Sequence, residues 1–243
     1  MLDRLRADGY DILARNHAEA ILATDFPGEL AEVIETLADF RIDVTELIGG
    51  GGGEAGPTRR LRRALAARGW IKHNFTLEVR LDGRPRQALS HEIDHLRRVA
   101  AGTIALEIEW NNKDPFFDRD LENFQRFHAW SAISAGVIIT RGASLQAALA
   151  RRIRTRLERD GIADEAGLAV YGIEERTRRQ RESVARVMAA GAGFAEAFTA
   201  SFVADKFGPA TTHWDKLALR VARGVGNPCP LLLIGLPEGV LTG

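Results

Sequence analysis

Hydrophobic and polar side chains alternate most regularly over residues 103–110. Leu106 and Ile108 alternate there with Glu107 and Glu109. A repeat of two residues is typical of a β-strand, because successive side chains of a strand point to opposite faces of the sheet. The pattern therefore predicts a strand that carries two carboxylates on the same face.

The middle of the chain, on both sides of this strand, alternates between strand and helix patterns. Period-two alternation, helical spacing of apolar residues and short apolar runs distinguish these elements. They predict, in order, a strand at 73–81, a second strand ending at Asp94, the strand at 103–110, a helix at 116–132, a buried strand at 136–140 and a helix at 144–160. We therefore expect an α/β fold with a central mixed β-sheet flanked by helices.

The flanking segments add helices and one more strand. Apolar spacing predicts a helix near 30–40, Pro57 opens a basic helix, and the apolar run at 230–235 predicts a buried strand. The glycine run at 49–53 predicts a loop and not a nucleotide-binding loop, because no Lys-Ser/Thr pair follows it. Residues 161–207 are rich in Ala and Arg and lack strand patterns, so we expect a helical insertion or subdomain within a single domain of residues 1–243.

Composition narrows the class of protein. The 243 residues are 45% hydrophobic and 27% charged, as in ordinary soluble globular proteins. The formal net charge is zero, so any nucleic-acid surface has to come from local arginine clusters. The single cysteine, Cys229, excludes an internal disulfide and suits a reducing cytoplasm. No apolar run reaches about 18 residues, so we expect a soluble cytoplasmic protein with no membrane association.

The spacing of three acidic residues indicates a metal site. Asp94 precedes Glu107 with twelve residues between them, and a β-hairpin of that length places the two on neighbouring strands. Three carboxylates that meet at one point repel one another unless a cation holds them, and Mg²⁺ prefers such oxygen ligands. We therefore expect a Mg²⁺ site at Asp94, Glu107 and Glu109. The alternative is that these are solvated carboxylates of an exposed strand face.

An alternative metal-binding pattern overlaps this site in the sequence. The segment His91-Glu92-Ile93-Asp94-His95 matches H-E-x-x-H, the zinc metallopeptidase pattern. That chemistry requires a helix, so that both histidines lie on one face. A zinc metallopeptidase is thus the alternative function, although it leaves the Glu-x-Glu strand unexplained.

The run ALEIEWNNKDPFFDRDLENFQRFHAWSAISAGVIITR, with GNPCPLLLIGLPEG near the C-terminus, resembles the BglII/BstYI family of type II restriction endonucleases. The resemblance implies the PD-(D/E)xK nuclease fold and a homodimer that acts on palindromic duplex DNA. It implies that Asp94, Glu107 and the carbonyl of Ile108 bind Mg²⁺, for which Mn²⁺ would substitute. Glu109 occupies the third catalytic position, where most of the superfamily has Lys and BamHI has Glu. Because Ile93 precedes Asp94 in place of proline, Glu92 is the second choice for the first acid.

The resemblance also implies Mg²⁺-dependent, sequence-specific double-strand cleavage that leaves 5′-phosphate ends, at a GATC-centred palindrome. Asparagine can pair with adenine in the major groove, so residues beside the catalytic strand are candidates for base contacts. The expected DNA-binding residues are Asn111, Asn112, Lys113, Thr211, Thr212, His213 and Lys216.

Structural roles compete with these DNA contacts. The two asparagines suit a turn before Pro115, and either Thr211 or Thr212 suits the N-cap of a helix. A DNA-binding protein that keeps the nuclease fold without catalysis, and a structure-specific repair nuclease, are further alternatives. The resemblance also implies that the helix at 116–132 forms part of the dimer interface.

Overall fold

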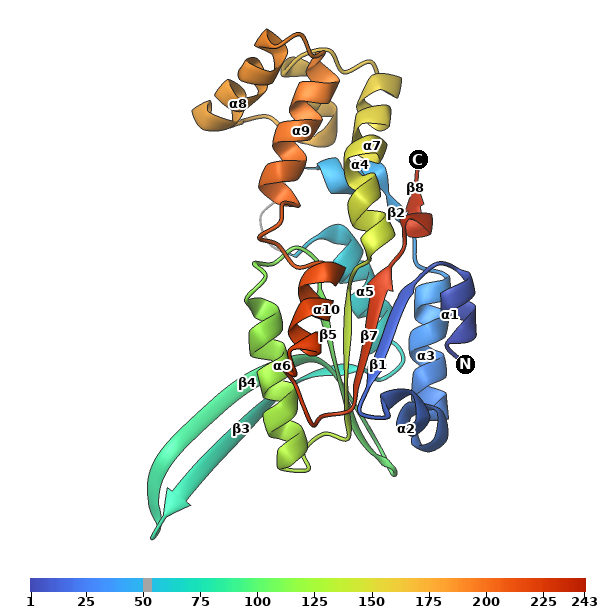
Figure 1. Cartoon of the computed structure of the whole chain (residues 1–243), viewed down its shortest axis with the longest axis vertical. Coiled ribbons are helices and arrows are strands. Elements are labelled where there is room, and N and C mark those ends of the chain that lie inside the picture. Colours follow the sequence, from blue (N-terminus) through green and yellow to red (C-terminus); the bar gives the residue numbers. More distant parts are fainter. Residues whose placement is uncertain (50–53) are drawn as a thin grey trace.

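A six-stranded mixed sheet forms the centre of the protein, in the computed structural model that describes residues 1–49 and 54–243 (Figure 1). The strand order is β1-β7-β6-β5-β4-β3. The strands are β1 (Asp11–Arg15), β3 (Ile71–Leu81), β4 (Arg84–Val99), β5 (Gly102–Glu109), β6 (Ala135–Arg141) and β7 (Leu231–Leu236). Neighbours β5, β6 and β7 run parallel, and the other pairs are antiparallel. The expected α/β fold with a central mixed sheet is confirmed.

Helices cover both faces of this sheet. The helices are α1 (Asp3–Ala7), α2 (Ala18–Asp25), α3 (Pro27–Ala38), α4 (Val44–Ile48), α5 (Gly56–Ala66), α6 (Phe116–Ala129), α7 (Ala143–Arg159), α8 (Arg178–Ala189), α9 (Phe194–Lys206) and α10 (Trp214–Ala222). Side chains of α6 and α10 share one hydrophobic core with Ala105 and Ile138 of the sheet. Those of α3, α5 and α7 share a second core with Leu106 and Val137 on the opposite face.

The smaller elements complete the chain. A short parallel pair joins β2 (Ile42–Asp43) to β8 (Leu241–Thr242), and short 3₁₀ turns lie at Ala166–Tyr171 and Glu238–Val240. Residues 161–207 contain the first of these turns together with α8 and α9. Residues 50–53 of the predicted glycine loop lie outside the described residues. None of the described helices combines the length and apolar character that crossing a bilayer requires.

The β3–β4 hairpin is longer than the strand beside it. β4 pairs with β3 from Arg84 to Leu96, but with β5 only from His95 to Val99. The rest of the hairpin projects from the body as an arm (Figure 1). Near its base, the step from Ile71 to His73 on β3 lies opposite the longer step from Leu96 to Ile93 on β4. The extra residue makes a β-bulge, which changes the direction of the side chains around it.

Candidate active site

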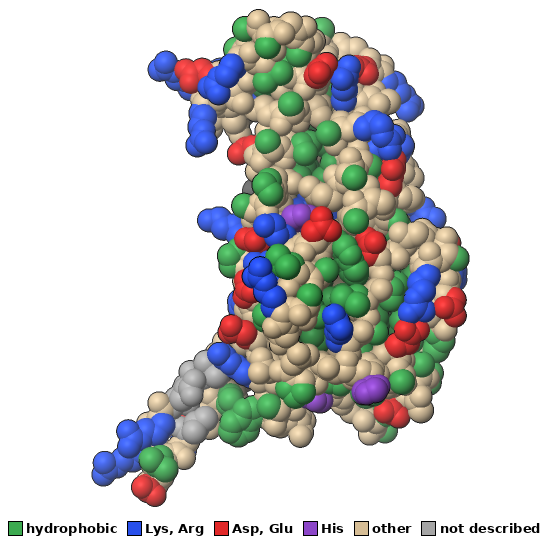
Figure 2. Space-filling view, in the orientation of Figure 1, with side chains coloured by type: hydrophobic (Ala, Val, Ile, Leu, Met, Phe, Trp, Pro, Cys, Tyr) green, Lys and Arg blue, Asp and Glu red, His purple; other side chains and the backbone are tan. Residues whose placement is uncertain are grey.

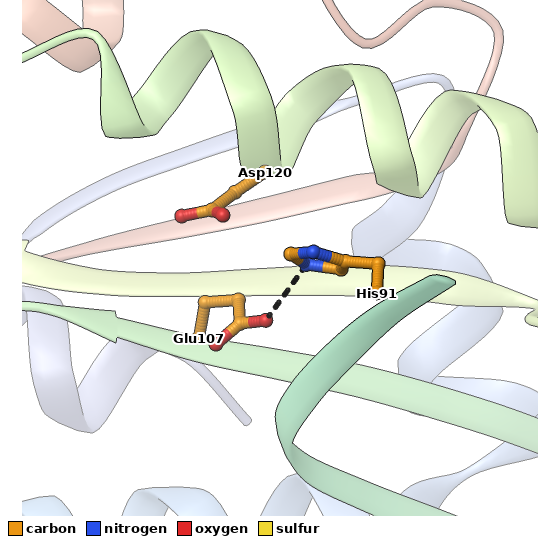
Figure 3. A group of neighbouring side chains, drawn as sticks. All are labelled: His91, Glu107 and Asp120. Atoms are coloured by element: carbon orange, nitrogen blue, oxygen red, sulfur yellow. Dashed lines mark ion pairs between the residues drawn. The ribbon is translucent and has the colours of Figure 1, made fainter. Parts of the chain in front are cut away.

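Three side chains suited to metal binding meet where β4, β5 and α6 come together: His91, Glu107 and Asp120 (Figure 3). One ligand atom of each lies within 4.8 Å of the others, and no other such group occurs in the described part of the chain. Glu107 and Asp120 are buried, and His91 Nε2 lies 3.8 Å from Glu107 Oε1. Of these three residues, the sequence predicts Glu107 as a Mg²⁺ ligand and His91 as part of the alternative zinc pattern, but it does not predict Asp120.

The packing of α6 against the sheet places Asp120. The helix buries Phe117, Leu121, Phe124 and Phe127, and Asp120 lies within this apolar stripe. The helix approaches β6 closely because Gly136 has no side chain; a Cβ there would overlap the ring of Phe124. An aspartate that takes a core position on a helix is uncommon. That position was the signal in the sequence that could have identified Asp120 as a site residue.

The cluster contains polar atoms that nothing in the protein satisfies. Glu107 Oε1, Asp120 Oδ2 and His91 Nε2 are buried and have no hydrogen-bond partner. Each such group costs about 1–3 kcal/mol when it is left unpaired. One divalent cation between these atoms would satisfy all three, and carboxylates suit Mg²⁺ or Mn²⁺ while imidazole suits transition metals. The residues present therefore fit a divalent metal ion.

Glu109 extends the cluster along β5. Its Oε2 accepts a hydrogen bond from Asn112 Nδ2 at 2.8 Å. Its Oε1 lies 3.6 Å from Arg119 NH2, which also lies 2.7 Å from Asp120 Oδ1. The Arg119 guanidinium packs over the ring of Phe116 at 4.4 Å from the ring centroid. Arg119 thus supplies a cation beside Glu109 and Asp120.

Burial and mutual repulsion shift the protonation of these acids. Burial raises the pKa of Glu107 well above its usual range, and the charges of Asp120, Asp94 and Glu109 raise it further. Burial, followed by the charge of Asp120, raises the pKa of Glu109 to about 9. Burial also raises the pKa of Asp120 and lowers the pKa of His91. Without a metal ion, the cluster therefore retains protons that ordinary carboxylates would release.

These shifts predict that the metal-free protein loses stability as the pH rises from about 5 to about 9. Glu109 ionises near its ordinary value of 4.5 in the unfolded chain and near 9 in the folded protein. Between these values the folded state holds the extra proton, so stability falls by up to about 1.4 kcal/mol per pH unit for such a group. Urea unfolding between pH 6 and pH 9 in EDTA measures this slope. Glu109→Gln should flatten it, and an unchanged slope in that variant would contradict the assignment.

The structure places Asp94 differently from the other two predicted acids. Its backbone N–H lies 3.4 Å from Glu107 Oε2, so the two residues are neighbours. Its side chain, however, is 45% exposed and lies 3.8 Å from Lys72 Nζ. Asp94 lines a large cavity on the other face of the sheet, together with Ile108, whereas Glu107 and Glu109 face α6. The β-bulge next to Asp94 turns its carboxylate away, so the three predicted acids do not form one ligand group.

The H-E-x-x-H segment lies in β4 and not in a helix. His91 stacks on Phe127, with ring centroids 6.2 Å apart, and faces Glu107. His95 is buried beside the carbonyl of Leu106 and lines the cavity, and burial lowers its pKa to about 4. The strand conformation removes the helix that a zinc peptidase site of this pattern requires.

The cavity beside Asp94 has a volume of about 960 Å³, and its lining contains four cationic side chains and the three acids Glu46, Glu54 and Asp94. We call it the basic cavity because the cations are in excess. The cationic side chains that line it are Arg59, Arg62, Lys72 and Lys206. Asn111 and Asn112 also line it, and Asn112 joins the cavity to the acidic cluster through its hydrogen bond to Glu109. Two of the predicted DNA-binding residues thus lie between a basic cavity and the acids.

The two predicted DNA-binding segments are joined to each other. Lys113 pairs with Thr211 as an isolated β-bridge, and Asn112 and Thr212 exchange hydrogen bonds. Thr212 and His213 are buried, and Lys216 lies 3.7 Å from Asp114. Neither threonine caps α10, whose N-cap residue is His213 and has no capping side-chain bond.

Arg141, at the end of β6, holds this junction together. Its Nε donates to the carbonyl of Trp110 at 2.9 Å, and its NH2 donates to Thr212 O and to Thr211 Oγ1, each at 2.7 Å. Its guanidinium packs over the ring of Phe207 at 5.0 Å. Arg141 is completely buried, and burial lowers its pKa to about 9. Sequence analysis missed this residue, because an arginine that ends a strand usually reaches solvent.

Comparison with known proteins agrees with this architecture. The family model described as restriction endonuclease BglII/BglIII matches residues 10–236, which is nearly the whole chain. A search of the curated proteins found no match. The matched range contains the complete six-stranded sheet, the acidic cluster and the basic cavity. The chain therefore belongs to the BglII/BglIII family of restriction endonucleases.

Proposed function

We propose that the protein is a Mg²⁺-dependent type II restriction endonuclease that cuts palindromic duplex DNA as a homodimer and leaves 5′-phosphate ends. The observation that supports this most strongly is the buried cluster of unpaired ligand atoms at His91, Glu107 and Asp120. A protein that is not built to bind a cation has little reason to keep three such atoms unsatisfied. Family membership supports DNA as the substrate.

Glu107 is the central ligand in this proposal, with His91 and Asp120 beside it. When bound, the ion would polarise the scissile phosphate and lower the pKa of a water molecule that attacks it. We propose that Asp94, and the carbonyl of Ile108, join Glu107 when DNA is present. In the free protein, Lys72 Nζ lies 2.6 Å from the carboxylate of Glu92 and 3.8 Å from that of Asp94. A DNA phosphate would compete for that lysine, and a rearrangement of the bulge next to Asp94 would then bring its carboxylate to Glu107.

Glu109 and Arg119 have complementary parts in the proposed reaction. In the metal-free protein the raised pKa keeps Glu109 protonated near neutral pH. A metal ion bound beside it would favour the ionised carboxylate, which could then accept a proton from the attacking water. Arg119 is 47% exposed at its side chain, so its guanidinium can reach a phosphate while it stays beside Asp120. It would stabilise negative charge that develops on the phosphate, which is the part played by lysine where that residue holds the third position.

The DNA is proposed to lie along the basic cavity. Its arginine and lysine side chains would neutralise phosphates, and Asn111 and Asn112 would contact base edges. Lys113, Thr211 and Lys216 are proposed to contact the backbone. Thr212 and His213 are buried, so their proposed role is to hold the segment around Thr211 in place.

A homodimer is proposed because a palindrome presents two equivalent half-sites to a two-fold symmetric protein. Two exposed aromatic side chains support α6 as part of the interface. Phe116, at the start of the helix, is 36% exposed, and Trp130, just after its end, is 59% exposed. We propose that the partner subunit covers both side chains in the dimer.

Digestion of a genomic DNA of known sequence tests the proposal. With Mg²⁺ the protein should give discrete fragments, and sequencing their ends gives the recognition sequence, such as a GATC-centred palindrome, and the stagger. Retention of DNA without any cutting in Mg²⁺ or Mn²⁺ would indicate a non-catalytic DNA-binding protein. Cutting that follows DNA structure instead of sequence would indicate a repair nuclease.

A further inference from the structure

Helix α8 carries an unusual concentration of positive charge for a protein of zero net charge. Its twelve residues, Arg178–Ala189, contain four arginines and one glutamate, a formal charge of +3. Val184 is the only fully buried side chain of the helix. The catalytic proposal gives this segment no role.

Three of these arginines lack acidic partners. On α7, Arg154 and Arg156 each pair with an acid four residues later, and on α8 Arg178 pairs with Glu182 in the same way. Arg179, Arg181 and Arg186 are exposed. They form no ion pair within 4.0 Å with any acid of the described chain. We call these three residues the α8 cluster.

The helix that presents the α8 cluster is firmly held. Thr177 and Gln180 form a capping box at its start, and Gln180 also donates a hydrogen bond to Asp205 of α9. Arg176 pairs with Glu165 and packs over Phe198. The helix that carries the exposed arginines is therefore already ordered, so binding a partner does not require it to fold.

The position of α8 identifies the class of partner. Figure 1 shows α8 at one end of the long axis and the β3–β4 arm at the other. In Figure 2 the side of the molecule between them is hollowed, and Lys and Arg side chains gather on the α8 end where it overhangs this hollow. An elongated polyanion that followed the hollow would pass α8. Duplex DNA is such a polyanion, with one negative charge per roughly 1.7 Å of its axis.

We propose that the α8 cluster binds backbone phosphates of the DNA that flanks the recognition sequence. The inference rests on the proposed function, since it takes DNA as the substrate. It gives residues 161–207 a role in affinity and not in sequence readout, because phosphate contacts position a protein on DNA without specifying bases.

The test measures how salt weakens binding to a labelled random-sequence duplex of about 40 base pairs in Ca²⁺. The quantity compared is the slope of log K against the logarithm of the salt concentration. Each lost phosphate contact makes this slope shallower by about 0.9. The variant is Arg179→Gln/Arg181→Gln/Arg186→Gln. The control, Arg4→Gln/Arg15→Gln/Arg223→Gln, removes the same charge from exposed positions on α1, β1 and the end of α10. We expect the α8 variant to lose about 2 to 3 from the slope for each subunit that contacts the duplex, and the control to match the wild type.

Equal slopes in the α8 variant and the control would overturn the inference. Genomic digestion separates this failure from failure of the proposed function. If the wild type cuts DNA but the slope is unchanged, only the role of α8 is wrong. If the slope falls as expected but no Mg²⁺-dependent fragments form, the α8 inference stands and the nuclease proposal fails. Circular dichroism of both variants checks that they are folded.

Discussion

Glu107→Gln is expected to reduce DNA cleavage by at least roughly 10³-fold, because it removes the central ligand of the proposed metal site. The substitution keeps the size of the side chain and removes one ionisable group from a buried cluster of repelling acids. The metal-free variant should therefore be as stable as the wild type, or more stable, at pH 8. The rate at which the variant digests genomic DNA measures the loss of cleavage. Thermal unfolding in EDTA measures the stability of the metal-free protein.

Metal binding gives an independent measurement on the same variant. A ligand at 100 times its Kd stabilises the folded state by about 2.7 kcal/mol, so Mn²⁺ should raise the Tm of the wild type. It should not raise the Tm of Glu107→Gln. Glu122→Gln is the matched control, because Glu122 also lies beside α6 core residues but is 55% exposed at its side chain and pairs with Arg126. Undiminished cleavage by Glu107→Gln would remove Glu107 from the mechanism.

Arg141→Met is expected to destabilise the protein by roughly 3 kcal/mol, because it leaves the carbonyls of Trp110 and Thr212 without their donor in a buried place. For a chain of this size that corresponds to a fall in Tm of roughly 6–12 °C. Methionine keeps most of the packing against Phe207. Thermal and urea unfolding measure the loss.

Arg176→Met provides the comparison for this variant. Arg176 also packs over a phenylalanine, Phe198 at 4.9 Å, but its main partner is the partly exposed carboxylate of Glu165. Its loss should cost only about 1 kcal/mol, since water can solvate Glu165 afterwards. If the two variants lost equal stability, the hydrogen bonds from Arg141 to the buried carbonyls would not be what makes Arg141 important for stability. The junction of the two proposed DNA-binding segments would then have to depend on other bonds.

The arrangement of the fold could be predicted largely from periodicity. The strand at 103–110, the buried strand at 230–235 and the helix that begins at 116 all occupy their expected places. Alternation also predicted that Glu107 and Glu109 share a face, and both point toward α6. Such features depend on local side-chain patterns, which the sequence displays directly.

The candidate site could be predicted only in part. Continued pairing of β4 with β5 beyond His95 would set Asp94 opposite Glu107, but the bulge turns its side chain to the other face. No residue pattern marks that bulge in advance. Asp120 was missed for a different reason, since its approach to Glu107 depends on how α6 packs against the sheet.

The projecting hairpin of β3 and β4 has a consequence for how enzymes of this architecture can diverge. Side chains of a strand repeat every two residues, so removing equal lengths from both strands at the tip would preserve the pairing of everything nearer the body. The arm can therefore lengthen or shorten by small insertions and deletions while Glu107, on the neighbouring strand, stays where it is. Evolution can therefore change how far the arm extends around a substrate without changing the residues that act on it.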